Sequence, residues 1–173
     1  MIQKSPEKGF TLLELMVVVA MITILAGLSI PNLNQWVQKQ KLSKNARDIL
    51  GVMQEAKAHA IEVGIPVVVG FSNGVGAAGT FTSFEDPNRN FIKDAKEKSL
   101  CSGCVNKSVE ITISSFETTS TDSTNTKKVS YTCFNGMGLA VGHSGEVRLK
   151  DIYNQTATLT LSNAGTIQIT TGS

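Results

Sequence analysis

Glu14 is the residue most suited to specific chemistry, because it is the one charged side chain in the apolar run from Phe10 to Ile30. A carboxylate inside an apolar helix is costly unless it is neutralised or paired, so an ionisable residue there is by default a functional hypothesis. Two interpretations remain open. Glu14 either snorkels from near the helix end, or it pairs with a cation. If cleavage after Gly9 frees the amine of Phe10, that amine in a neighbouring subunit provides the counter-charge.

Three cysteines form the second group with chemical potential, Cys101, Cys104 and Cys133. A haem attachment site needs His directly after the second Cys of the pair, and that position is not His. A zinc site needs a fourth ligand, for which only His59 and His143 are available. The sequence therefore predicts a structural disulfide, either within the Cys101–Cys104 pair or from one of them to Cys133, and does not choose between these pairings.

The segment 86–97 carries oxygen ligands at the spacing of an EF-hand calcium loop. The candidates are Asp86, Asn88, Asn90, Asp94 and Glu97. The turn glycine that such a loop needs at its sixth position is replaced by Phe91, and no flanking helix pair is evident. An exposed polar loop is therefore the default interpretation, with calcium binding as the alternative, and no metal site and no cofactor is predicted.

Enzymatic chemistry finds no support in the spacing of the remaining residues. His59 and His143 belong to no Ser-His-Asp, Cys-His or paired-carboxylate arrangement. The net charge of +2 does not indicate a nucleic-acid partner, because phosphate binding needs clustered Lys and Arg. The sequence therefore predicts a structural role and no catalytic residues.

The apolar run sets the organisation of the chain. Residues 10–30 form a helix of about 31 Å at ~1.5 Å per residue, which matches the ~30 Å hydrocarbon core of a bilayer. The preceding segment 1–9 is polar and contains Lys4 and Lys8, so it is expected to stay cytoplasmic. We therefore predict a leader over 1–9, a transmembrane stem over 10–31, an amphipathic helix over 32–63 and a globular head over 64–173.

The helix is predicted to change character at Pro31, which removes a backbone donor and should bend or locally melt it. Beyond this point apolar residues recur at alternating spacings of four and three, which indicates one buried stripe. Gly64 and Pro66 are expected to end the helix. The stripe consists of Leu42, Ala46, Ile49, Met53, Ala56, Ala60 and Val63.

The head is predicted to be antiparallel β-structure packed on the helix, an α+β fold. Its strand patterns mostly alternate apolar and polar residues. Asn163-Ala-Gly165 lies between two such runs and predicts a hairpin with Gly165 at positive φ. The Ser/Thr-rich stretch 114–126 is interpreted as an exposed loop that can include part of a hairpin. The predicted strands cover 66–71, 109–113, 129–134, 146–149, 158–161 and 166–169.

The N-terminal residues Lys8-Gly9-Phe10-Thr11-Leu12-Leu13-Glu14-Leu15, followed by an uninterrupted apolar helix, resemble the leader of type IV pilins and pseudopilins. The resemblance implies cleavage by a prepilin peptidase between Gly9 and Phe10, and N-methylation of Phe10. It also implies that Glu14 sets subunit register during assembly. Pro31 falls where many pilins carry a helix-kinking proline.

The end of the chain resembles the GspH/FimT group of pseudopilins and minor pilins, through an aromatic strand, a Gly-Glu-Val-Arg strand and a closing hairpin. This resemblance implies a head of two small sheets against the helix. Some competence-linked members of that group bind DNA through arginines after the glycine of the final hairpin. Here the place reads Gly165-Thr-Ile-Gln168, with no Arg, so DNA is an unlikely partner.

Together these patterns predict a minor pilin or pseudopilin, assembled into or priming a type IV pilus or a related envelope filament. A type II secretion pseudopilin and a DNA-binding minor pilin are the alternatives. The expected partners are other pilin subunits, the prepilin peptidase and, before assembly, the inner membrane. The head is then expected in the periplasm, and the assembled filament at the cell surface or in the periplasm.

Overall fold

The computed structural model describes residues 9–113, 116–120, 128–140 and 142–172. The chain divides into two compact units, residues 1–37 and 38–173. The helical segment from Gln38 onward thus belongs with the β-structure, and this second unit is called the head below. Most of the predicted leader, 1–8, and much of the Ser/Thr-rich stretch lie outside the described residues.

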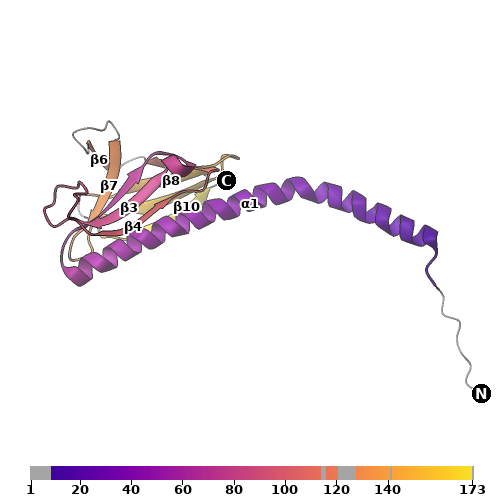
Figure 1. Ribbon diagram of the computed structural model, residues 1–173, viewed down its shortest axis with the longest axis horizontal. Helices are drawn as coiled ribbons and strands as arrows, with labels where there is room; N and C mark the ends of the chain where they lie inside the picture. Colours follow the sequence, from indigo (N-terminus) through magenta and orange to yellow (C-terminus); the bar gives the residue numbers. More distant parts are fainter. Residues whose placement is uncertain (1–8, 114–115, 121–127, 141, 173) are drawn as a thin grey trace, which may run out of the picture. The chain divides into compact units, whose positions relative to one another are not determined.

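One long helix, α1, spans Leu12–Val63. It ends as the sequence predicts, because Gly64 follows with φ of 75° and donates its N–H to the carbonyl of Ala60. Such a left-handed glycine is a common way to terminate a helix. The part of α1 within the head is visible beside the strands in Figure 1.

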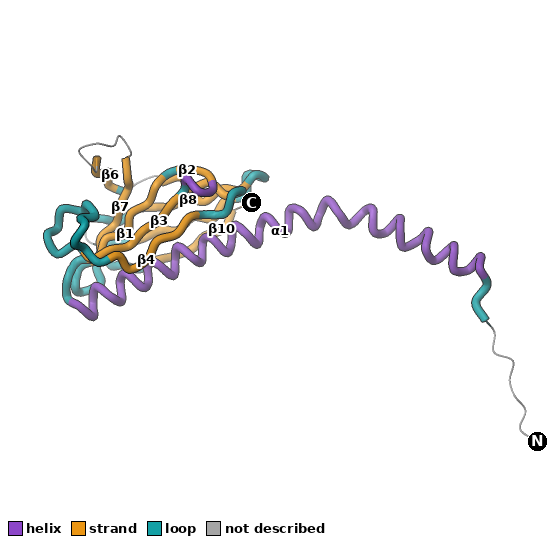
Figure 2. The backbone as a smooth tube through the Cα atoms, in the orientation of Figure 1, coloured by secondary structure: helices purple, strands orange, loops and turns teal. Residues whose placement is uncertain are grey.

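Within the described residues, ten strands form two antiparallel sheets beside the helix, so the predicted α+β fold is confirmed (Figure 2). The first sheet has the strand order β4-β3-β1-β7-β6 and the second the order β10-β9-β8-β5-β2. A short 3-10 helix, η1, covers Gly76–Ala78. The strands are β1 Val67–Ser72, β2 Gly74–Val75, β3 Thr80–Glu85, β4 Ser99–Cys104, β5 Val109–Ile113, β6 Glu117–Ser120, β7 Lys128–Phe134, β8 Gly145–Asp151, β9 Thr156–Leu161 and β10 Ile167–Gly172.

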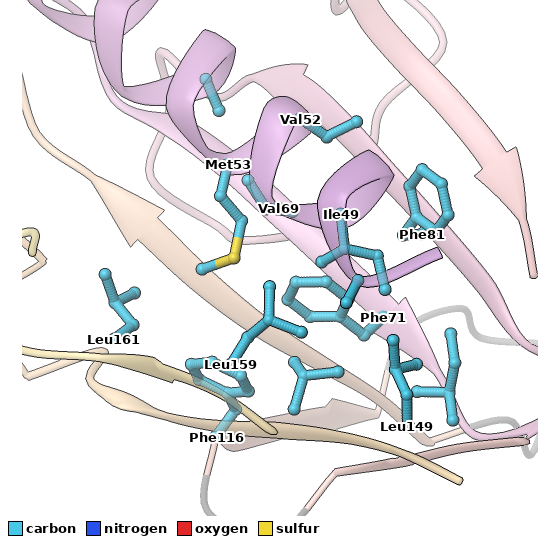
Figure 3. Close-up of a cluster of buried hydrophobic side chains, with 14 of the residues drawn as sticks. Ile49, Val52, Met53, Val69, Phe71, Phe81, Phe116, Leu149, Leu159 and Leu161 are labelled. Carbon is cyan, nitrogen blue, oxygen red and sulfur yellow. The ribbon is translucent and has the colours of Figure 1, made fainter. Parts of the chain in front are cut away.

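The main core lies between the apolar stripe of α1 and both sheets (Figure 3). Six of the seven predicted stripe residues are buried, and only Val63, at the end of the helix, is exposed. Ala46, Ala56 and Ala60 are almost fully buried, and their small side chains let the helix backbone approach the strands. Ile49 and Met53 meet Phe71 from the first sheet and Leu159 from the second.

A second apolar cluster covers the other face of the first sheet. It consists of Val68, Phe84, Tyr131 and Cys133, with Phe91 of the 86–98 loop packed against them. The ring of Phe91 stacks on that of Tyr131, with centroids 4.8 Å apart. Strand β1 is therefore buried on both faces, which explains why its sequence is a continuous apolar run rather than an alternating one.

The predicted hairpin at Gly165 joins β9 and β10 and has the expected positive φ of 71°. A side chain at Gly165 would collide with the carbonyl oxygen of Gly138, so the two glycines pack backbone to backbone. Lys57 of α1 donates a hydrogen bond from Nζ to the Gly165 carbonyl, at 2.8 Å. The closing hairpin is thus fastened to the helix.

Candidate functional site

The start of α1 is built by an N-cap that places Glu14 in the first turn. Thr11 Oγ1 accepts a hydrogen bond from the backbone N–H of Glu14, at 3.2 Å. Thr11-Leu12-Leu13-Glu14 has the spacing of a capping box, in which the N-cap hydroxyl satisfies an orphan N–H of the first turn. Our sequence reasoning missed Thr11, although its motif was readable. The cap also explains why the helix begins at Leu12 and not at Phe10 as predicted.

The peptide bond predicted to be cleaved is accessible. Gly9 and Phe10 precede the N-cap and are not helical, and Phe10 is 84% exposed. Proteases need an extended, accessible backbone rather than a helix, and exposed termini offer it. Phe10 thus precedes the N-cap residue Thr11 in the chain, whereas Glu14 follows it. The amine of a processed Phe10 therefore lies outside the first helical turn.

Apolar side chains predominate among the described residues in the rest of the first unit, and they are exposed. Thr23 is polar, but its hydroxyl donates to the carbonyl of Ala20 at 2.8 Å within the helix. Contiguous exposed apolar surface of this kind marks protein or membrane contacts. The exposed residues include Leu12, Leu13, Leu15, Met16, Met21, Ile22, Ile24, Leu25, Leu33 and Trp36.

No helix within the described residues is both long enough and apolar enough to qualify as a membrane span.

The backbone of α1 stays helical at Pro31. The predicted local melting is therefore not part of this structure. Proline has no N–H, so the carbonyl of Gly27 loses its usual partner at this turn. Opening of the helix here during assembly stays a prediction.

Cys101, Cys104 and Cys133 all carry free thiols in this structure, so a disulfide among them stays a prediction. Cys101 and Cys104 lie three residues apart on β4, about 10 Å in a strand. Disulfides need Cα atoms within roughly 7 Å. Cys133 lies on β7, three strands from β4 and so about 14 Å away. The extended conformation of β4 therefore holds Cys101 and Cys104 too far apart for a bridge in this structure.

The three thiols are expected to react at very different rates. Burial raises the pKa of the Cys133 thiol to about 12, with the nearby Asp86 charge acting in the same direction, so little thiolate forms. Cys104 is exposed. Iodoacetamide at pH 8 should therefore label Cys104 first and Cys133 only after unfolding, by peptide mass spectrometry. Labelling of fewer than three thiols in urea without reductant would contradict free cysteines.

The candidate calcium ligands form hydrogen bonds within the loop itself. Asp86 is fully buried, and its two carboxylate oxygens accept backbone N–H groups of Asn90 and Phe91 at 3.2 and 2.9 Å. Asp94 Oδ2 accepts from the side-chain amides of Asn88 and Asn90, at 2.8 and 3.1 Å. The N–H of Asp94 donates to Glu97 Oε2 at 2.8 Å.

These hydrogen bonds turn the amide donors, not the amide oxygens, toward the Asp94 carboxylate, which is the reverse of a calcium cage. In the part of the chain that is described, no three His, Cys, Asp or Glu side chains are grouped to hold a metal ion. The loop's polar residues therefore position Phe91 over Tyr131.

A small polar network links α1 to the first sheet. His59 Nε2 lies 2.7 Å from Glu85 Oε1, and Lys98 Nζ lies 3.5 Å from the same oxygen. The side-chain hydrogen bond from His59 holds the pKa of the Glu85 carboxyl below its ordinary value of 4.5, and Lys98 contributes in the same direction. No local sequence pattern indicates that His59 and Glu85, 26 residues apart, form a contact.

This network predicts an acid-sensitive contribution to stability. A carboxyl whose folded pKa is lowered stabilises the fold above its unfolded pKa of about 4.5, and the contribution is lost as the pH falls through the folded value. Glu85→Gln should therefore lower stability by roughly 1 kcal/mol at pH 6, the upper range for such pairs. The difference should shrink at pH 3. Urea unfolding at both pH values measures it, and a pH-independent difference would contradict the account.

Two family models match the chain. The prokaryotic N-terminal methylation motif matches residues 4–30, and the model of the type II transport protein GspH matches residues 45–165. The first covers Gly9, Phe10 and Glu14, whereas the second covers most of the head.

Curated relatives are similar to this chain over a short segment. The type IV major fimbrial protein FimA of Dichelobacter nodosus is 49% identical over 41 residues, which is 24% of this chain and 26% of the relative. FimA of strain VCS1703A is 51% identical over 41 residues, 24% and 25% of the two chains. The chain thus spans about a quarter of the length of the curated relatives it matches. No solved structure gives a significant match.

Proposed function

Because the chain belongs to the GspH family of type II transport proteins, whose model matches more than half of it, we propose that it is a minor pilin or pseudopilin. It serves as a structural subunit, not an enzyme, in a type IV pilus or a related envelope filament. The observation that carries this proposal is the apolar surface that the described helical residues of the first unit expose. Such a surface is suited to lipid before assembly and to other stems afterwards.

The proposed mechanism begins with cleavage between Gly9 and Phe10 by a prepilin peptidase, followed by N-methylation of Phe10. The new N-terminus carries a positive amine next to an apolar stem. In the filament this amine pairs with Glu14 of a neighbouring subunit, which fixes the axial register of the stems. The N-cap at Thr11 supports this proposal, because it fixes where Glu14 projects from the first turn.

Before assembly the stem holds the chain in the inner membrane, with the head in the periplasm. The methylation motif over residues 4–30 supports this location. The absence of charge between Leu15 and Gln38 supports it as well, since a charged side chain is costly at membrane depth. Bending at Pro31 would adapt the stem to the filament.

A pseudopilin of type II secretion is the second candidate, and the family's own description favours it. Deletion in the native host separates the two. Loss of surface pili with secretion intact supports the pilus role, whereas loss of protein secretion with pili intact supports the secretion role. If the chain is absent from sheared filaments and its deletion affects neither process, the proposed function is wrong.

A further inference from the structure

The head has one end at which the chain enters it from residue 37, and we call this the stem-proximal end. Its parts come from distant sequence segments. Ser108 Oγ donates to Gln38 Oε1 at 2.7 Å, and the N–H of Asn106 donates to Asn45 Oδ1 at 3.2 Å. The end of β10 and the start of β9 adjoin the same stretch of α1, since all three line one groove.

That groove is lined largely by hydrogen-bond donors and has a volume of about 340 Å³. Lys39, Ser43 and Arg47 stand one helical turn apart, on one face of α1. Thr156 and Thr171 face them from β9 and β10. Neither Lys39 nor Arg47 forms an ion pair within the described part of the chain. The groove therefore has the chemistry to receive an anionic oxygen group such as a phosphate.

An apolar turn lies next to this groove. Ile152 and Tyr153, in the β8–β9 turn, are 63% and 42% exposed. Asp151 holds the turn rigidly, because its Oδ1 accepts the N–H groups of Tyr153 and Gln155, both at 2.8 Å. The turn holds the apolar side chains of Ile152 and Tyr153 in contact with water, which is unfavourable. Tyr is also a residue favoured at membrane–water interfaces.

The chain segments at the stem-proximal end carry more basic than acidic residues. Opposing the basic residues are the exposed Asp48, and Glu110, which faces Lys150 across the β5–β8 pair. Asp151 is buried and engaged by the turn. The basic residues are Lys39, Lys41, Lys44, Arg47, Lys107 and Lys150.

We infer that the stem-proximal end is a docking surface for anionic phospholipid, on which the head rests before the subunit enters a filament. Lys39 and Arg47 bind a lipid phosphate in the groove, and Ile152 and Tyr153 enter the interface. The basic side chains of the groove are complementary in charge to an anionic lipid. They also follow the stem directly, because Lys39 comes after the uncharged segment that ends at Gln38. The inference rests on the proposed function, since it needs the stem to hold the chain in a membrane.

Tryptophan reporters in the full-length chain test this contact. Trp36 is the only native tryptophan, so Trp36→Phe gives a silent background. Tyr153→Trp places a reporter in the turn. Met137→Trp is the matched control, because Met137 is 74% exposed near the opposite end of α1, where Gly136 and Gly138 approach Gly64 and Ile61. Each chain is reconstituted in vesicles with brominated acyl chains, made of phosphatidylglycerol with phosphatidylcholine or of phosphatidylcholine alone.

With phosphatidylglycerol, bromine should quench the Tyr153→Trp reporter at least about threefold more strongly than the Met137→Trp reporter. Adding Lys39→Gln and Arg47→Gln, or 0.5 M salt, should remove most of that difference, because both weaken attraction to the phosphates. Circular dichroism checks that the variants keep their fold.

Equal quenching of the two reporters overturns the inference, as does quenching of Tyr153→Trp that is unchanged in phosphatidylcholine alone. Protection of that reporter only when other pilin subunits are added also overturns it, since the surface then binds protein. If the chain floats with the vesicles and the prepilin peptidase cleaves it after Gly9, but the reporter shows no quenching, only this inference is wrong. If the chain neither floats with the vesicles nor is cleaved, both this inference and the proposed function are wrong.

Discussion

Glu14→Ala is expected to reduce incorporation of the chain into filaments by at least about 100-fold. In the proposed assembly the Glu14 carboxylate neutralises the amine of a neighbouring Phe10 between apolar stems. Removing one partner of a buried pair leaves the other charge uncompensated, at a cost of roughly 3–5 kcal/mol. Since about 1.4 kcal/mol corresponds to a tenfold change, this exceeds two orders of magnitude.

The measurement is quantitative immunoblotting of sheared filaments against total cell protein. Glu55→Ala is the matched control, because Glu55 is an exposed carboxylate on the same helix, within the head. It should assemble at the wild-type level. Processing is checked in parallel by the size of the mature chain, so that loss of assembly is not confused with loss of cleavage. Normal incorporation of Glu14→Ala would remove the role given to this residue.

Phe71→Ala is expected to destabilise the head by roughly 3–5 kcal/mol, the usual range for truncating a buried Phe. Phe71 is fully buried at the meeting point of α1 and both sheets, and its ring stacks on Phe116 with centroids 5.6 Å apart. The melting temperature should fall by about 10 °C. Thermal unfolding followed by circular dichroism measures the change.

Val75→Ala serves as the control, because Val75 is 54% exposed at the edge of the second sheet. Exposed substitutions away from special contacts usually change stability by less than about 0.5 kcal/mol. If Phe71→Ala and Val75→Ala shift the melting temperature equally, the core is not arranged as described.

Local patterns were sufficient to predict the helix and most strands. The stripe from Leu42 to Ala60 has helical spacing, and it is buried as expected. Gly165 was predicted at positive φ because a tight hairpin needs it, and the structure agrees. These features depend on residues close in sequence, whose periodicity already contains the information.

The misses have identifiable causes. Strand β3 has Phe81 and Phe84 three positions apart, one in each of the two apolar clusters, so it lacks the regular alternation that reveals a strand. Strand β4 contains Cys101 and Cys104, which were considered as candidates for a disulfide or a metal site and not as part of a strand. Strand β3 pairs with β1, and β4 pairs with β3. These pairings stabilise both strands, and the strand propensities of their residues do not reveal them.

The candidate sites divide in the same way. Thr11 and Glu14 form a local motif, and it was available from the sequence. The oxygen ligands of 86–97 matched a spacing, but spacing does not say whether an oxygen faces a cation or a backbone N–H. Contacts such as His59 with Glu85 depend on how α1 lies on β3, so no local pattern revealed them.

The most direct test of the account is mass spectrometry of the mature N-terminus, from protein purified from the native host. The account predicts a chain that begins at Phe10 and carries a methyl group on its amine, and an unprocessed chain when the prepilin peptidase is absent. A chain that retains Met1, or one cut anywhere other than after Gly9, would contradict it.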